Sequence, residues 1–292
     1  MRVGYFAIGI GPLTEPAMIK TVAATTERLG FSTLWAPEHV VLLSEYSSRY
    51  PYSAGEFPMP VGTPFGDPFT TLTYAAALTS KIRLATGICL VPEHNPLVLA
   101  KTVATADRLS GGRFILGTGI GWLEEEFQAI GVTWERRAQR TREYIEAMRL
   151  LWSHEQASYS GEFVNFRGAL SSPKPTHNRV PVWFGGESGP ALRRVAEYGD
   201  GWIGFNLSPA EAAPKIKRIE ELLKANGRKR SEVELAVSPY MKPMTTDDLK
   251  RYRDLGVDEV ATVVFDIPPT ERELVARIER VARDFVEPAA RL

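Results

Sequence analysis

The 292 residues of this chain are 44% hydrophobic, enough for a sizeable core, and carry 35 basic and 35 acidic side chains. A formal net charge of zero gives no basic excess for binding nucleic acid or an anionic membrane. No apolar stretch approaches the roughly 20 residues that span a bilayer, and we expect no signal peptide. Cys89 is the only cysteine, so we expect no intrachain disulfide and a cytoplasmic, reducing location.

Strand-like and helix-like patterns alternate along the whole chain. Short apolar runs, typical of strands covered on both faces, are each followed by a helical pattern. The predicted strands are 3–8, 33–36, 82–88, 114–118, 182–184, 201–204, 233–237 and 259–265, and the predicted helices are 14–29, 67–79, 97–109, 123–129, 138–152, 189–198, 208–226, 247–255 and 270–285.

This alternation predicts an α/β fold, a single (β/α)8 TIM barrel that forms one domain over residues 1–292. A doubly wound open sheet is the alternative. Two long insertion loops, at about 40–66 and 153–179, interrupt the pattern, and the second contains a small predicted hairpin. The first carries the rings of Tyr46, Tyr50, Tyr52 and Phe57. It is predicted either to cover an apolar or planar ligand or to make an oligomer contact.

The stretch from 180 to 205 is predicted to form a strand, a glycine turn and a helix. Gly185 and Gly186 follow the apolar strand directly, and Ser188 stands at the expected N-cap of the helix. A helix N-terminus presents free N–H groups and a partial positive charge, which suits a phosphate. The other interpretation is a tight turn with no ligand.

The carboxyl ends of barrel strands form the active-site face in this architecture, so the residues that follow each strand are candidates. Glu38 and His39 follow the second strand, and a histidine there serves either as an acid or base or as a packed loop residue. The other candidates at strand ends are Ala7, Gly87, Ile88, Thr118 and Gly119.

Two further sequence patterns are predicted to have no chemical role. None of the four histidines shows a metal-binding spacing, so we expect no metal site. The acidic run 124–126 opens a helix, where carboxylates favour the helix dipole, and we assign it no chemical role.

Five segments together resemble the bacterial luciferase-like superfamily of flavin and deazaflavin enzymes, and within it the oxidoreductases that use coenzyme F420. They are PEHVVL, LATGICLVPEHNPLVLAK, LSGGRFILGTGIGWLEEEF, PKP and WFGGESGPALRRVAEYGDGW. They follow the expected order and span most of the chain. The block LSGGRxxLGxGxGW with GGxSGPALRR is specific for the superfamily rather than for the cofactor, because relatives use FMN on the same scaffold.

The resemblance implies a role for each matching position. Glu38 and His39 would stand beside the cofactor ring as catalytic residues. Gly87 and Ile88 would form a bulge behind the ring, where the family often has a cis peptide bond. Thr118 and Gly119 would contact the ring or its side chain. The cofactor phosphate would be held by Gly185, Gly186, Glu187 and Ser188.

The resulting expectation is an F420-dependent oxidoreductase that moves a hydride between the deazaflavin and a small organic substrate. Related sugar-phosphate dehydrogenases have an acidic residue where this chain has Ile120, so an apolar or planar substrate is expected instead. The alternatives are an FMN-dependent monooxygenase that uses oxygen and a non-catalytic flavin-binding barrel. A homodimer is implied by the resemblance alone.

Overall fold

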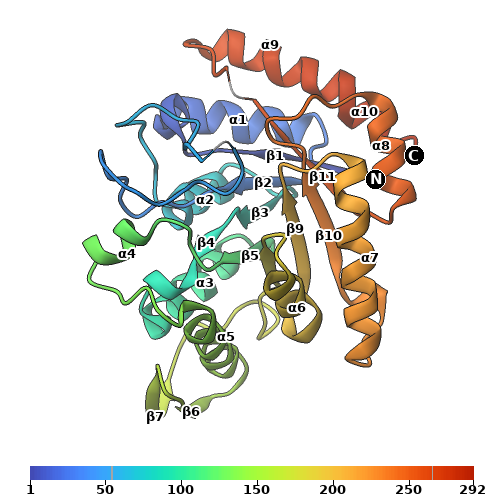
Figure 1. Ribbon diagram of the computed structural model, residues 1–292. Helices are drawn as coiled ribbons and strands as arrows, with labels where there is room; N and C mark the ends of the chain where they lie inside the picture. The colour runs from blue at the N-terminus through green and yellow to red at the C-terminus, as the bar shows by residue number, and fades with distance from the viewer. Residues whose placement is uncertain (54, 265) are drawn as a thin grey trace.

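A computed structural model describes residues 1–53, 55–264 and 266–292 of the chain. Over these residues eight parallel strands form a closed barrel, because β3 pairs with β2 on one side and with β5 on the other (Figure 1). The barrel is confirmed and the open sheet is excluded. The strands are β1 (Arg2–Phe6), β2 (Thr33–Ala36), β3 (Arg83–Thr86), β5 (Phe114–Gly119), β8 (Val182–Gly185), β9 (Gly201–Phe205), β10 (Glu234–Ser238) and β11 (Glu259–Val263).

The last strand, predicted over 259–265, ends at Val263, and Phe265 of that prediction lies outside the described residues. The third predicted strand, 82–88, is broken rather than continuous. β3 ends at Thr86, the Gly87–Ile88 peptide bond is cis, and the short strand β4 (Cys89–Leu90) then pairs with β5. This break directs the Ile88 side chain toward the carboxyl end of β5.

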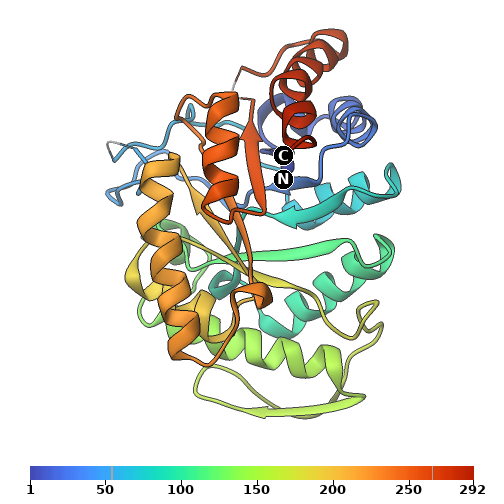
Figure 2. The same ribbon diagram turned by 90° about the vertical axis from the view of Figure 1, so that its right-hand side faces the viewer.

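Helices cover the outside of the barrel (Figures 1 and 2). Several begin at side chains that suit an N-cap, as the capping box of Ser208 and Glu211 illustrates. The first helix, predicted over 14–29, begins at Pro16, because Thr14 closes a 3-10 turn by donating to the Gly11 carbonyl. The helices are α1 (Pro16–Arg28), α2 (Pro68–Ala77), α3 (Pro96–Leu109), α4 (Glu124–Ala129), α5 (Arg137–Ser153), α6 (Gly189–Tyr198), α7 (Pro209–Ala225), α8 (Thr246–Asp254), α9 (Glu271–Val281) and α10 (Glu287–Ala289).

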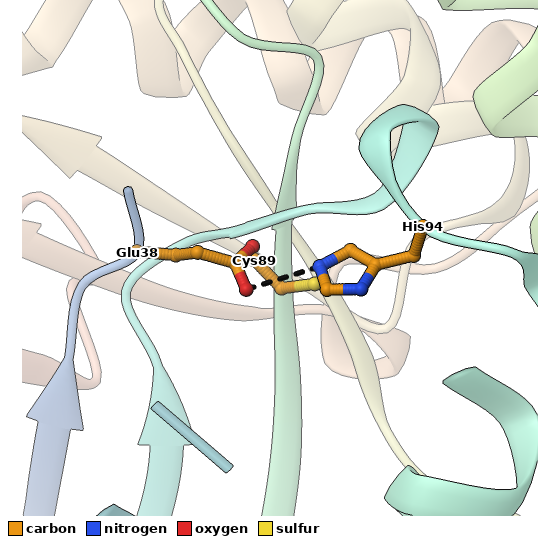
Figure 3. A group of neighbouring side chains, drawn as sticks. All are labelled: Glu38, Cys89 and His94. Carbon is orange, nitrogen blue, oxygen red and sulfur yellow. Dashed lines mark hydrogen bonds and ion pairs between the residues drawn. The ribbon is translucent and has the colours of Figure 1, made fainter. Parts of the chain in front are cut away.

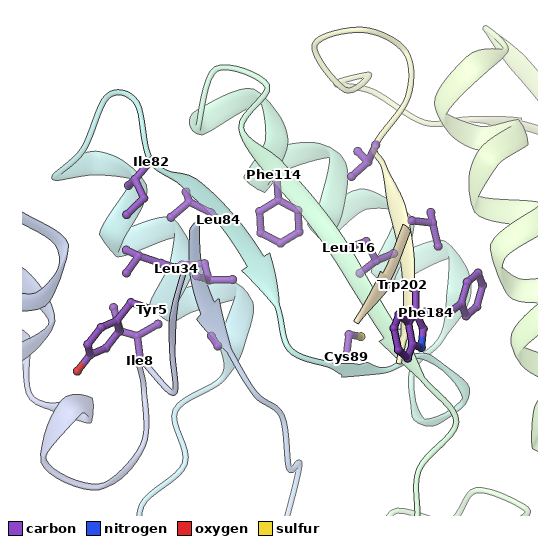
Figure 4. Close-up of a cluster of buried hydrophobic side chains, with 14 of the residues drawn as sticks. Tyr5, Ile8, Leu34, Ile82, Leu84, Cys89, Phe114, Leu116, Phe184 and Trp202 are labelled. Carbon is purple, nitrogen blue, oxygen red and sulfur yellow. The ribbon is translucent and has the colours of Figure 1, made fainter. Parts of the chain in front are cut away.

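Hydrophobic side chains fill both the barrel interior and the layer between strands and helices. The outer layer includes Leu34, Leu84 and Phe114, which point from the strands toward the helices (Figure 4). Inside the barrel, Trp35 and Trp183 pack against each other with ring centroids 5.6 Å apart. These buried rings fill the interior of the barrel, and a cavity lies beyond them at the carboxyl ends of the strands.

The hairpin of the second insertion and the two termini lie away from the cavity. The predicted hairpin is confirmed as β6 (Gln156–Ser160) and β7 (Asn165–Leu170), which lie beside α5 (Figure 2). The two termini meet, since the amino group of Met1 donates to the carbonyl of Ala289 at 3.2 Å. Within the described chain, none of the helices combines the length and the apolar character that crossing a membrane requires.

Candidate active site

A cavity of about 620 Å³ opens at the carboxyl ends of the barrel strands. Its walls come from strand ends and from the loop over 40–66, so segments far apart in sequence meet there. Most of the predicted site residues line it. They are Ala7, Glu38, His39, Gly87, Ile88, Gly119, Gly185, Gly186 and Ser188.

One wall of the cavity is formed by Ile88 against two glycines. A Cβ added to Gly119 would lie 1.8 Å from Ile88 Cδ1, and one added to Gly185 would lie 3.2 Å from Ile88 Cγ2. Because glycine has no Cβ, both residues leave room for the Ile88 side chain. The result is an apolar wall without projecting side chains from β5 or β8, which suits the face of a planar ring.

The N-terminus of α6 borders the same cavity. Ser188 caps the helix, with its hydroxyl accepting from the Ala191 N–H at 3.3 Å. Gly186 has a φ of 100°, a conformation that favours glycine. One turn into the helix, Arg194 also lines the cavity and is largely buried, which lowers the pKa of its guanidinium without removing its charge at neutral pH. Free N–H groups and a cation therefore converge at one end of the cavity.

Glu187 is placed differently from its neighbours in the loop. Its carboxylate accepts a hydrogen bond from the Phe205 N–H at 2.8 Å and another from the Tyr52 hydroxyl. Burial raises the pKa of Glu187 to about 7. The side chain thus joins the loop after β8 to the loop over the cavity.

His39 lies at the mouth of the cavity and is held by a buried carboxylate. Its Nδ1 is 2.8 Å from Glu126 Oε2, and Glu126 Oε1 accepts from the Val41 N–H at 3.1 Å. Glu126 belongs to α4 and is only 1% exposed. The bond fixes the ring through Nδ1 and leaves Nε2 as the nitrogen for a ligand. The run 124–126 was expected to have no chemical role, and the structure adds that Glu126, its last residue, contacts His39.

Glu38 lines the cavity, but its carboxylate is directed to β4 and the turn that follows it. Its carboxylate accepts from the Leu90 N–H at 2.5 Å and from the Cys89 thiol, and it is 3.0 Å from His94 Nε2 (Figure 3). Burial raises the pKa of the Cys89 thiol well above its ordinary value. Burial of His94 lowers the pKa of its imidazole, but the hydrogen bond with Glu38 outweighs this effect, so the pKa is raised.

Ligand atoms of Glu38, Cys89 and His94 all lie within 4.8 Å of one another, a spacing that would also suit a metal ion. Their mutual hydrogen bonds explain the arrangement, because the Cys89 thiol and His94 Nε2 both already face the Glu38 carboxylate. We therefore interpret the group as a support for β4.

Thr118 was expected to contact a cofactor, but its side chain is fully buried. The hydroxyl donates to the Trp183 carbonyl at 2.9 Å and joins β5 to β8. Its neighbour Gly119 supplies the surface of the cavity at that strand end.

Aromatic rings from the loop over 40–66 close the outer side of the cavity. Phe57 stacks on Trp122 with centroids 5.8 Å apart, and both rings contact His39 edge-on. Tyr52 packs against Phe205 at the other side of the mouth. Tyr50, Tyr52 and Phe57 of this loop line the cavity, as a lid over a planar or apolar ligand requires.

Sequence reasoning missed Arg194 and Glu126. Arg194 stands in the GPALRR segment three residues after the first turn of α6, so its spacing from Ser188 was a usable signal. Glu126 contacts a residue 87 positions away, and nothing local identifies that contact.

A protein-family model described as luciferase-like monooxygenase matches residues 1–261. The chain belongs to this family. An uncharacterised protein from Mycobacterium tuberculosis (strain ATCC 25618 / H37Rv) is 36% identical over 264 residues, which are 89% of this chain and 91% of that protein. The 5,10-methylenetetrahydromethanopterin reductase of Archaeoglobus fulgidus is 28% identical over 85% of this chain and 66% of its own length.

Solved structures share the fold of this luciferase-like chain. The coenzyme F420-dependent tetrahydromethanopterin reductase from Methanopyrus kandleri superposes with a TM-score of 0.75 at 19% identity, covering 98% of this chain and 99% of that one. The monooxygenase RslO1 from Streptomyces bottropensis gives a TM-score of 0.76 at 20% identity, with the same two coverages. Both deazaflavin-dependent enzymes and monooxygenases therefore occur on this barrel.

Proposed function

We propose that this protein is an F420-dependent oxidoreductase that transfers a hydride between the deazaflavin and a small apolar or planar organic substrate. The observation that carries the proposal is the wall at Ile88, Gly119 and Gly185, which leads to the N-terminus of α6. A planar ring against that wall would place a phosphate tail near Gly186, Ser188 and Arg194.

The dimensions and lining of the cavity support this assignment. About 620 Å³ is within the range of cofactor sites, and most of the lining is apolar or aromatic. A Cβ at Gly119 or Gly185 would intrude on the wall, so the residues present fit a flat ring. The relative in Archaeoglobus fulgidus, a methylenetetrahydromethanopterin reductase, supports reductive chemistry.

The cofactor, when bound, would supply the hydride and accept it in the reverse direction. The chain itself would position the ring, exclude water with the loop over 40–66, and hold a proton at His39. Glu126 would orient His39 through Nδ1, so that Nε2 delivers the proton to the substrate or polarises it. Glu38 would support this region through β4.

The second candidate is an FMN-dependent monooxygenase, which the family description and the fold of RslO1 favour. Titration of the purified protein with oxidised deazaflavin and, separately, with FMN distinguishes the two. We expect saturable binding of the deazaflavin with a change in its absorbance and much weaker binding of FMN. Tight binding of FMN alone, with rapid reoxidation of the reduced flavin by oxygen, would instead favour the monooxygenase.

We also propose that the protein is a homodimer, as the resemblance implies. Sedimentation equilibrium at several protein concentrations tests this directly. A mass that equals one chain at all concentrations would contradict it.

A further inference from the structure

The middle of the loop over 40–66 forms one wall of the cavity, while both ends of this loop are fixed to the barrel. Near its start, the Ser47 N–H donates to Glu125 Oε1 at 2.6 Å. At its end, the Gly66 N–H donates to the Gly9 carbonyl at 2.8 Å. The residues between these ends that line the cavity include Tyr50, Tyr52, Phe57 and Met59. The contacts that hold this middle part against the barrel therefore decide how open the cavity is.

The middle of the loop has few backbone groups that bind the barrel. Its prolines have no N–H group to donate, and they are Pro51, Pro58 and Pro60. Among the described residues from 49 to 62, one backbone atom makes a hydrogen bond to a residue outside the loop. The Tyr52 carbonyl accepts from Asn206 Nδ2 at 2.7 Å.

Asn206 uses both polar atoms of its side-chain amide to join the loop to the barrel. It follows β9 directly, and its φ of 55° lies in the left-handed region, which asparagine tolerates. While Nδ2 donates to the Tyr52 carbonyl, Oδ1 accepts from the Met241 N–H at 3.3 Å. Met241 belongs to the segment after β10, so one side chain connects the loop to two strand ends.

Other contacts of the same part of the loop include packed rings and a hydroxyl group. The Tyr52 ring packs on Phe205 with centroids 5.0 Å apart, and the Tyr52 hydroxyl donates to Glu187. Phe57 stacks on Trp122 with centroids 5.8 Å apart. Hydrophobic contact between rings is not directional, so it tolerates small movements of the loop. The hydrogen bond from Asn206 forms only when the loop is docked on β9.

We propose that the loop over 40–66 is a gate to the cavity and that Asn206 is the residue that keeps it shut. When the bond to Tyr52 breaks, the middle of the loop moves away from β9 while its two ends stay fixed, and ligands enter or leave. When the bond forms again, the loop closes over the ligand and excludes water. Asn206 is not among the described residues that line the cavity, so it acts through Tyr52 as a positioning residue.

Two variants of Asn206 test the gate, and one variant elsewhere is the matched control. Asn206→Asp keeps the acceptor for the Met241 N–H but turns a carboxylate oxygen toward the Tyr52 carbonyl, which repels it. Asn206→Gly suits the positive φ and removes both bonds, so it replaces Asn206→Asp if that protein does not fold. Asn226→Asp makes the same change in an amide that donates to the Leu222 carbonyl at 2.8 Å, at the C-terminus of α7.

Hydrogen exchange followed by mass spectrometry tests the gate without any cofactor. Peptides from the middle of the loop should exchange about tenfold faster or more in Asn206→Asp than in the wild type, because a bond that holds the closed state is lost. Peptides from the barrel strands should be unchanged, and Asn226→Asp should match the wild type in the loop. Unchanged exchange in the loop, or a similar increase in loop and strands, would overturn the proposal.

Binding rates separate a gate from a simple ligand contact. Stopped-flow fluorescence with the oxidised deazaflavin gives the rate constants of association and dissociation. A gate that opens more often raises both, so we expect both to increase about tenfold in Asn206→Asp while the dissociation constant changes less. An increase in dissociation alone would overturn the gate. A wild type that does not bind the deazaflavin would count against the proposed function, and hydrogen exchange would still decide on Asn206.

Discussion

The side chain of Ile88 occupies the space into which any side chain at Gly119 would project, with Cδ1 only 1.8 Å from the position of an added Cβ. Ile88 follows the cis peptide bond between β3 and β4, and Gly119 ends β5, so two separate strand ends fit together at the cavity wall. The fit explains why a glycine stands at the end of β5.

We predict that Gly119→Ala displaces Ile88 into the cavity. The expected results are a loss of unfolding free energy of about 1–3 kcal/mol, typical of overpacking, and weaker cofactor binding. Urea denaturation and a fluorescence titration with the deazaflavin measure the two effects. The double variant Ile88→Ala/Gly119→Ala should be more stable than the sum of the single effects predicts, because the clash is relieved. Additive effects would show that the two residues do not compete for this space.

Arg194 provides a second prediction, at the anion-binding end of the cavity. Arg194→Gln should weaken cofactor binding by about tenfold or more, since a charge-assisted contact to phosphate contributes about 1.5–3 kcal/mol. Arg193→Gln is the matched control, because it removes the same charge from the adjacent, exposed position, which does not line the cavity. Isothermal titration calorimetry with the deazaflavin compares them. Equal losses in both variants would indicate only a general charge effect.

His39 carries the third prediction. Its Nδ1 is fixed by Glu126, and it lines the cavity, so it is placed for proton transfer. His39→Ala should lower turnover by about 10²-fold or more, as expected for loss of general acid–base catalysis, while the cofactor dissociation constant changes little. Steady-state rates and a binding titration separate these effects. Turnover within about threefold of the wild type would argue against a chemical role.

The sequence predicted the parts of the site that depend on local patterns. The Gly185–Gly186 turn, the Ser188 cap and the alternation of strands and helices follow from residues a few positions apart. The pairing of His39 with Glu126 could not be predicted in this way, because it depends on how α4 packs over the end of β2. For the same reason Thr118 was expected in the cavity, although its hydroxyl joins two strands. The direction of the Thr118 side chain depends on the pairing of β5 with β8, which local patterns do not give.

The amino-terminal end of the barrel is closed by a buried ion network, and it provides the last prediction. Glu259 is fully buried and accepts hydrogen bonds from Trp35 Nε1 at 2.8 Å, from the Thr33 hydroxyl at 2.8 Å and from Arg83 Nη2 at 2.7 Å. Glu234, which also binds Arg83, is 43% exposed at its side chain.

Glu259→Gln should lower the free energy of unfolding by about 3 kcal/mol or more, because it removes the fully buried carboxylate and leaves the Arg83 guanidinium with only the half-exposed Glu234. Glu234→Gln should cost less than about 1 kcal/mol, because solvent screens that ion pair. Chemical denaturation of both variants tests the difference, and cofactor affinity should stay unchanged because the network lies at the end of the barrel opposite the cavity. A similar loss for both variants would show that burial does not distinguish these two carboxylates.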